Sequence, residues 1–153
     1  MTDETAEIAA TDRLRLRKSG LAAAAFLFRL LNEPSWIRNI GDRGVRTPAD
    51  AEGYIRTKML ASYAALGFGM YLVESIDEHI PMGVAGLVKR DTLPLPDLGF
   101  AFLPEFWGQG FAGEAAAAVM RYSRSSLGLT RLLAIVSPDN ERSSRLLEKL
   151  GFA

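Results

Sequence analysis

Three glycines close together give one stretch of this sequence the features of an anion-binding turn. Gly108, Gly110 and Gly113 fit the pattern G-x-G-x-x-G, with a predicted strand before them and a predicted helix after them. The start of a helix offers backbone N–H groups without acceptors and a partial positive charge. Glycines at 108 and 110 also let the main chain approach a ligand closely. The turn is therefore suited to a diphosphate bound by the amides from Gly108 to Gly113.

Two familiar nucleotide-binding turns fit this stretch poorly. A Rossmann turn has its first glycine directly at the strand end, whereas residues 104–107 intervene here. Asp139 stands where a ribose-binding acid would, but residues 140–153 are too few to complete a doubly wound sheet. A P-loop requires Lys-Ser/Thr after its glycines, and Phe111-Ala112 occupies that place. A dehydrogenase is thus disfavoured and a P-loop is excluded.

Composition excludes several other kinds of chemistry. The chain has no cysteine, which rules out a disulfide framework, a thiolate metal site and a cysteine nucleophile. His79 is the one histidine and lies in a predicted polar turn, so we expect neither a catalytic triad nor a bound metal. Eighteen basic residues balance eighteen acidic ones, which argues against nucleic acid or an anionic membrane as partner. Residues 1–11 lack the basic side chains of a targeting segment, and the expected location is cytoplasmic.

The elements that position the glycine turn follow from hydrophobic periodicity and capping residues. Residues 13–17 alternate charged and apolar side chains, which predicts a half-buried strand. Ser19 is the predicted cap of a helix that ends before Pro34, and a loop is predicted for residues 33–46. Thr47 is the predicted cap of a second helix that runs to Leu66.

The second half of the chain supplies most of the predicted sheet. Strands are predicted over residues 68–75, 81–90, 98–103 and 131–136. Helices are predicted over residues 110–127 and from Asn140 to Gly151. The short apolar run 131–136 predicts a strand buried on both faces. The order predicts one α/β domain with a mixed sheet, preceded by a disordered or extended segment over residues 1–11.

Two separated motifs resemble one known family. The segment FLPEFWGQGFAGEA contains, from Trp107 to Ala112, a match to the pyrophosphate loop R/Q-x-x-G-x-G/A of the GNAT N-acetyltransferase superfamily. Trp107 departs from the usual Arg or Gln and is typical of the RimJ/RimL-like branch of ribosomal-protein acetyltransferases. The segment SPDNERSSRLLEKLGF resembles the next motif of the family. The resemblance extends over nearly the whole chain and includes residues 13–17 and 40–47.

The resemblance implies a fold and a cosubstrate. The fold is an α/β (α+β) single three-layer domain over residues 12–153, with a mixed, mostly antiparallel sheet flanked by helices. The cosubstrate is acetyl-CoA, whose pantetheine arm would pair with the strand Phe100, Ala101 and Phe102. Asn140 would hydrogen-bond the same arm, or serve as a plain helix cap, or do both. The remaining expected coenzyme contacts come from the loop and the last helix: Trp107, Gly108, Gln109, Gly110, Phe111, Ala112, Gly113 and Ser143.

The implied reaction is direct attack of an amine on the thioester. No cysteine is present, and an acyl-serine route has no evident base. The amine needs a base, for which Asp97 is the first choice, Glu105 the second and a chain of waters the third. Backbone N–H groups near Phe102 would polarise the carbonyl. Many family members have a tyrosine on the last helix that acts as the general acid for the leaving thiolate, and Leu147 occupies its position here. We therefore expect Ser143 to hydrogen-bond the leaving sulfur.

The acceptor side and the assembly are the remaining expectations. Trp36, Arg38 and Asp42 would line a pocket for a primary amine of a protein N-terminus or a small molecule, although Asp42, Arg38 and Arg43 would equally form surface ion pairs. Family members usually continue with two more strands, which we expect to be missing here. An uncovered strand edge at 131–136 would favour a homodimer. The alternative function is a CoA-binding sensor or interaction module without turnover.

Overall fold

A single sheet forms the centre of the computed structural model, which describes residues 6–134 and 141–152. Its six strands lie in chain order, and all neighbours are antiparallel except the parallel pair β5 and β6. The mixed, mostly antiparallel sheet predicted from the sequence is thereby confirmed. The strands are β1 (Glu7–Ala10), β2 (Leu14–Lys18), β3 (Met70–Ser75), β4 (Pro81–Val88), β5 (Asp97–Phe102) and β6 (Leu133–Ala134).

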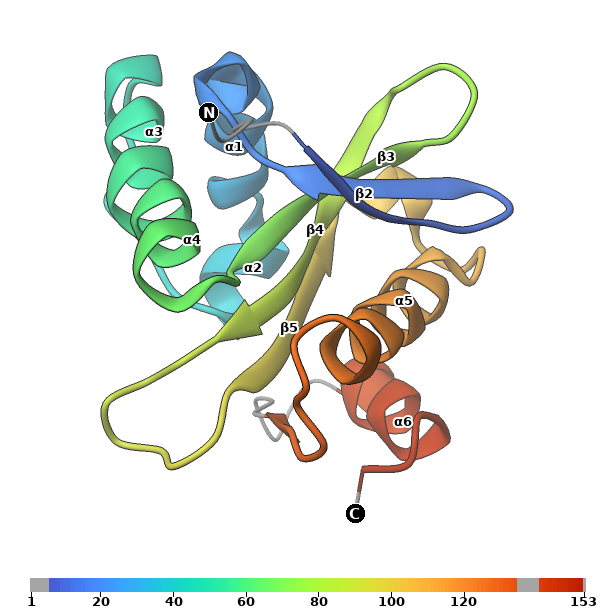
Figure 1. Cartoon of the computed structure of the whole chain (residues 1–153). Coiled ribbons are helices and arrows are strands. Elements are labelled where there is room, and N and C mark those ends of the chain that lie inside the picture. The colour runs from blue at the N-terminus through green and yellow to red at the C-terminus, as the bar shows by residue number, and fades with distance from the viewer. Residues whose placement is uncertain (1–5, 135–140, 153) are drawn as a thin grey trace.

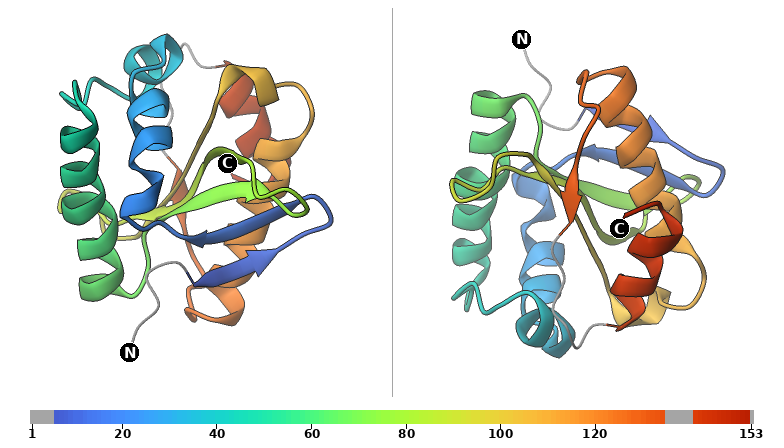
Figure 2. Two further views of the ribbon diagram at one scale, coloured as in Figure 1. Left: turned by 90° about the horizontal axis from the view of Figure 1, so that it is seen from above. Right: turned by 90° about the horizontal axis from the view of Figure 1, so that it is seen from below.

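Helices cover both faces of this sheet and complete three layers. The first four α-helices pack on one face, while α5 and α6 pack on the other (Figures 1 and 2). Their bounds are η1 (Leu21–Ala23), α1 (Ala24–Leu31), α2 (Pro34–Asn39), α3 (Pro48–Tyr54), the π-helical η2 (Ile55–Leu60), α4 (Ala61–Leu66), η3 (Pro104–Phe106), α5 (Phe111–Ser125) and α6 (Glu141–Lys149). Within the described ranges, no helix has both the length and the apolar character needed to cross a bilayer.

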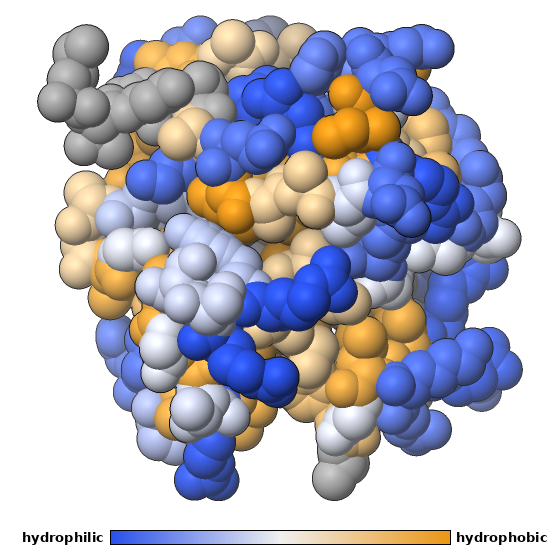
Figure 3. All heavy atoms as spheres, turned by 45° about the vertical axis from the view of Figure 1, so that its right-hand side comes forward, coloured by the Kyte–Doolittle hydropathy of each residue, from blue (hydrophilic) through white to orange (hydrophobic). Residues whose placement is uncertain are grey.

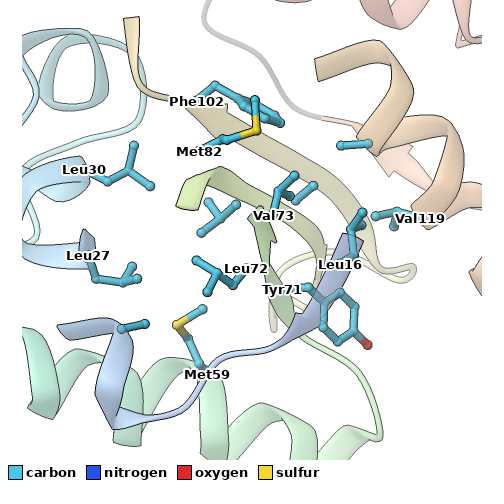
Figure 4. Packing of buried hydrophobic residues seen from close by; sticks show 14 of the residues in the cluster. Leu16, Leu27, Leu30, Met59, Tyr71, Leu72, Val73, Met82, Phe102 and Val119 are labelled. Carbon is cyan, nitrogen blue, oxygen red and sulfur yellow. The ribbon is translucent and has the colours of Figure 1, made fainter. Parts of the chain in front are cut away.

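The core fills the space on both sides of β3 because successive side chains of a strand point to opposite faces. Leu72 points toward Leu27 and Met59, while Tyr71 and Val73 point toward the α5 side (Figure 4). All of these residues are buried. On the face shown in Figure 3, hydrophilic side chains border small apolar patches, which fits a chain whose large apolar groups are mostly inside.

The segment around the first helix differs from the sequence prediction in two ways. Ser19 is not a helix cap: it is buried, its N–H donates to the Tyr63 hydroxyl at 3.0 Å, and Gly20 precedes η1 without a side-chain cap. The predicted loop 33–46 contains the helix α2, which begins with Pro34 at its first position. Proline suits that position because a backbone N–H there would have no intrahelical acceptor, so its absence removes no hydrogen bond.

The second helix agrees with its predicted start and end. Thr47 Oγ1 accepts the Asp50 N–H at 3.1 Å, and the helical run from Pro48 ends at Leu66 before Gly67. The Asp50 carboxylate accepts the N–H of Arg46, the residue before the cap, at 3.0 Å. A π-helical segment, Ile55–Leu60, interrupts the α-helical pattern between α3 and α4.

Of the predicted strand over 131–136, the structure describes residues 131–134, and only Leu133 and Ala134 form β6. Both are half-buried, which is less than the prediction of burial on both faces requires. Arg131 and Leu132 precede β6 and are not part of it, and Ile135, Val136 and Asn140 lie outside the described residues. The last helix, Glu141–Lys149, agrees with its prediction. At the N-terminus, Glu7–Ala10 forms a strand that pairs with β2.

Candidate active site

The turn before α5 presents open backbone amides. Gly108 and Gly110 have φ angles of +75° and +82°, a left-handed conformation that glycine adopts without strain. No side chain caps the helix at Gly110. Among the described residues, no acceptor is bonded to the amides from Gly108 to Gly113. These N–H groups and the positive end of α5 are therefore suited to an anion, as the sequence predicts.

A side-chain cluster at the β1–β2 turn supports this loop from behind. Arg13 donates to the Gln109 carbonyl at 3.0 Å and to Glu114 at 2.7 Å, and its guanidinium lies 4.3 Å from the centre of the Phe111 ring. Thr11 donates its hydroxyl proton to Glu114. Partial burial opposes ionisation of Glu114, but the hydrogen bonds from Thr11 and Arg13 outweigh it and lower its pKa. We call Thr11, Arg13 and Glu114 the loop clamp.

Trp107 joins the loop to its neighbours on both sides. Its Nε1 donates to the Phe102 carbonyl at 2.9 Å, which anchors the loop to the end of β5. The guanidinium of Arg142, on α6, lies 5.0 Å from its ring. Gly113 serves packing: a Cβ there would lie 3.1 Å from Leu146 of α6. The third glycine of the motif thus permits close approach of two helices.

A cavity of about 490 Å³ lies beside β5 and reaches from α2 to α6. β5 pairs with β4 along its whole length, but with β6 only at Asp97 and Leu98. In the described part of the chain, the other edge of residues 99–102 therefore has no strand neighbour. Phe100, Ala101 and Phe102 line the cavity beside this open edge, and Ala112 and Trp107 line its loop side. Gln109 and Phe111 line a separate groove next to the loop clamp instead.

Of the two expected bases, Asp97 is the one that lines the cavity. It is 3% exposed, and its Oδ2 accepts from Arg90 Nε at 3.2 Å. Its Oδ1 is buried and has no partner among the described residues. The sequence analysis missed Arg90, although the antiparallel hairpin that pairs Val88 with Asp97 would have placed it nearby.

Glu105 lies away from that cavity. It is exposed on η3, and its carboxylate pairs with Arg29 at 2.5 Å. It lines the separate groove beside Gln109. The structure therefore does not bring the second expected base close to the first.

The last helix contributes two cavity-lining residues that the sequence singled out. Ser143 lies on α6 and lines the cavity, as its expected contact with the coenzyme requires. Leu147 lies one turn further and is buried, so the position of the family's tyrosine carries no hydroxyl.

The expected acceptor residues divide into two groups. Trp36 and Arg38, on α2, line the cavity. Asp42 does not: it pairs with Arg46 at 2.5 Å and accepts the Gly44 N–H at 2.9 Å. The hydrogen bond from Arg46, aided by that of Gly44, lowers the pKa of Asp42 to about 2. The surface ion pair expected as the alternative role of Asp42 thus exists, with Arg46 as its partner.

Two further residues line the same cavity as Trp36 and Arg38. Arg43 follows α2, and Tyr54 lies at the end of α3. Burial raises the pKa of Tyr54, and the nearby cation of Arg43 opposes that rise. The sequence analysis did not find Tyr54, because its place depends on how α3 packs against α1.

Fold and site together define the class: a three-layer acyltransferase-type domain with open amides at a helix start and a strand edge beside a cavity. The acetyltransferase (GNAT) domain family matches residues 13–153, so the chain belongs to the GNAT N-acetyltransferases. This confirms the resemblance inferred from the two motifs.

Individual relatives agree with this assignment. An uncharacterized N-acetyltransferase, YoaA of Bacillus subtilis, is 34% identical over 56% of this chain and 64% of its own length. The ribosomal protein uS5-alanine N-acetyltransferase of Escherichia coli is 33% identical over 58% of this chain and 45% of its own. This chain thus spans less than two thirds of either relative.

A solved structure shares the fold. RimL, a ribosomal alpha-N-protein acetyltransferase in complex with coenzyme A, superposes with a TM-score of 0.82 at 16% identity, covering 95% of this chain and 83% of that one. The ribosomal-protein acetyltransferase among the sequence relatives is of the RimJ/RimL-like kind that Trp107 led us to expect.

Proposed function

We propose that this chain transfers the acetyl group of acetyl-CoA directly to a primary amine. The observation that carries the proposal is one cavity bordered by an edge of β5 that has no strand neighbour among the described residues, by the loop before α5 and by the buried carboxylate of Asp97. Family membership supports the reaction class. The acceptor is a small molecule or a protein N-terminus, as the names of relatives that act on ribosomal proteins suggest.

The residues divide the work of binding between loop and strand. The amides from Gly108 to Gly113 bind the diphosphate, and residues 100–102 of β5 hydrogen-bond the pantetheine arm with their open edge. Asn140, by family resemblance, adds a hydrogen bond to that arm. Trp107 and Arg142 hold the loop against α6.

The chemical step needs two protons to move and one bond to be exchanged. Asp97 accepts a proton from the ammonium of the acceptor, and the free amine forms a bond to the thioester carbon while the carbon–sulfur bond breaks. Backbone N–H groups near Phe102 stabilise the carbonyl oxygen. Ser143 donates to the departing sulfur, and the second proton of the amine completes the coenzyme thiol.

Binding and turnover are tested separately. Acetyl-CoA at a hundredfold excess over its dissociation constant should stabilise the protein by about 2.7 kcal/mol, and NAD should not. A panel of amines and N-terminal peptides should then release free CoA. Stabilisation without CoA release from any amine would favour the sensor, and stabilisation by NAD alone would overturn the class of ligand.

A matched pair of glycine variants tests the loop. Gly108 and Gly128 both have positive φ, +75° and +68°, and a Cβ added at either position would meet no described atom within 4 Å. Gly108→Ala and Gly128→Ala should therefore cost similar stability, about 1–2 kcal/mol. Only Gly108→Ala should weaken acetyl-CoA binding, because only Gly108 belongs to the loop. Equal coenzyme affinity in the two variants would contradict the diphosphate site.

A further inference from the structure

Two buried polar atoms without partners belong to residues that line the same cavity. Trp36 is 6% exposed, and its Nε1–H has no acceptor among the described residues. Asp97 is 3% exposed, and its Oδ1 has no donor there. An unpaired buried donor or acceptor costs about 1–3 kcal/mol. A ligand with one hydrogen-bond acceptor and one cationic donor would satisfy both atoms.

Two cations lie on the Trp36 side of the cavity. Arg38, on α2, and Arg43, just after it, both line the cavity, and neither forms an ion pair or hydrogen bond with another described residue. Glu33 lines the same side, but its carboxylate pairs with Arg29 at 3.7 Å. Guanidinium groups match the planar oxygens of carboxylate and phosphate, so this end of the cavity is suited to an anion.

We infer that the acceptor is a primary amine that also carries a carboxylate or phosphate group. This inference rests on the proposed function and adds the chemical class of the acceptor. Asp97 binds the ammonium end through Oδ1, while Trp36, Arg38 and Arg43 bind the anionic end. The cavity volume of about 490 Å³ is of the size that holds small ligands. A polyamine would meet these two arginines, and the site disfavours it by charge repulsion.

These arginines are separate from the expected diphosphate site. The helix α2 lies on the face of the sheet covered by the first four α-helices, whereas the loop before α5 lies on the other (Figures 1 and 2). Gly108 to Phe111 do not line the cavity that Arg38 and Arg43 line. The anion bound by Arg38 and Arg43 is therefore part of the acceptor.

The test uses pairs of amines that differ only in charge. The CoA-saturated protein is titrated calorimetrically with free amino acids and their amides, and with phosphoethanolamine and ethanolamine. Short C-terminally amidated peptides that begin with Asp or Asn form a second arm. At least one anionic member should bind about tenfold more tightly than its neutral partner. The arm that shows the preference tells whether the acceptor is a small molecule or an acidic N-terminus.

Variants assign that preference to residues. The double variant Arg38→Gln/Arg43→Gln should reduce it to about twofold or less, and Trp36→Phe should weaken it in part, because the ring remains but the N–H donor is lost. The double variant should bind acetyl-CoA like the parent. The matched control is Arg121→Gln/Arg124→Gln, two exposed arginines of α5 outside the cavity, which should keep the full preference.

Several other outcomes would overturn the inference. No preference in any pair, no binding by any anionic member, or a preference for the neutral member would do so. A preference that survives in the Arg38/Arg43 double variant would place the anion elsewhere, and a tenfold loss of acetyl-CoA affinity would assign the arginines to the coenzyme. If an anionic amine binds but no CoA is released, the acetyl transfer fails while the acceptor site stands.

Discussion

Two aspartates of this chain each lie beside an arginine, yet their surroundings suit them to different work. Asp42 is exposed and uses both oxygens on Arg46. Asp97 is buried and gives only Oδ2 to Arg90, so Oδ1 faces no other described partner. An acid that keeps one free oxygen at a cavity can accept a proton from a ligand. Asp42 is therefore a structural carboxylate, whereas Asp97 is a candidate base.

The first prediction concerns Asp97. Asp97→Asn keeps the shape of the side chain but removes its ability to accept a proton, so kcat/KM for CoA release should fall by about 10²–10⁴. The dissociation constant of acetyl-CoA, measured by calorimetry, should stay within about twofold, because other residues bind the coenzyme. Asp91→Asn, in the exposed turn before β5, is the control and should keep parental activity. An Asp97→Asn enzyme as active as the parent across pH would refute this base.

The second prediction concerns Asp42. Its carboxyl carbon should titrate by NMR with a pKa of about 2, and Arg46→Gln should move that pKa toward the ordinary value of about 3.9. Because the folded-state pKa is lowered, the stabilisation by this pair is present above pH ~4 and is lost as pH falls toward 2. The exposed Glu52, with its own partner Arg56, is an internal reference that Arg46→Gln should leave unchanged. An ordinary pKa for Asp42 in both the parent and the Arg46→Gln variant would contradict the ion pair of Asp42 with Arg46.

At the scale of elements, the loop before α5, which is proposed to bind the coenzyme, depends on a contact outside its own sequence. The loop clamp connects the β1–β2 turn to the first turn of α5 through Arg13 and Glu114. The same arginine binds the Gln109 carbonyl inside the loop. A loop held in place before binding loses less entropy when a ligand arrives.

The third prediction follows from that clamp. Arg13→Gln should weaken acetyl-CoA binding by about fivefold, the equivalent of one exposed ion pair. Arg13 does not itself line the cavity, so the effect would act through the loop. Arg121→Gln, on the exposed face of α5, removes the same charge elsewhere and should bind acetyl-CoA normally. Calorimetric affinities for both variants make the comparison. Matching affinities would mean that the loop holds its shape without Arg13.

How much the sequence predicts depends on the range of the interaction that shapes each element. The strands β3 and β4 and the helix capped by Thr47 are set by neighbouring residues, and all three elements were predicted. The helix α2 also had a local signal, Pro34 after an extended residue, which the polar composition of the segment concealed.

Long-range contacts could not be read from the sequence. Ser19 is a good cap by type, but the distant Tyr63 hydroxyl binds its N–H. Glu105 and Asp97 are both acids at strand ends, and only the packing of η3 against Arg29 turns Glu105 away. The same limit applies to the unpaired atoms of Trp36 and Asp97, which become visible once burial is known.

At the scale of the whole molecule, a tyrosine cluster connects the sheet to helices of both layers. The rings of Tyr63 on α4 and Tyr71 on β3 stack with centres 5.6 Å apart, and Tyr122 on α5 lies 6.0 Å from Tyr71. The Tyr63 hydroxyl donates to the Met70 carbonyl and accepts the Ser19 N–H. Burial raises the pKa of Tyr63 to about 12 and also raises that of Tyr71.

The fourth prediction is an alkaline limit to stability. The folded state keeps these tyrosines neutral past their ordinary pKa of about 10, so their contribution to stability is full below pH 10 and is lost as pH rises toward 12. Tyrosinate absorbance should lag behind that of free tyrosine and then rise together with the loss of circular dichroism.

A conservative variant checks the source of that limit. Tyr63→Phe keeps the stacked ring, removes one late-titrating hydroxyl and leaves the Ser19 N–H without its partner. It should cost about 1–3 kcal/mol at neutral pH in denaturant unfolding. Tyrosinate absorbance that rises well before unfolding begins would show that the cluster is open to water.

The loop clamp joins residues separated by 103 positions, Thr11 and Glu114. During synthesis these two residues leave the ribosome far apart in time, because the chain emerges from its N-terminus onward. The proposed grip on the coenzyme is thus completed only after the first hairpin and α5 have both formed. Acetyl-CoA would act on a newly made chain as a selective stabiliser of its finished form, and a nascent chain that stops short of α5 would gain nothing from it.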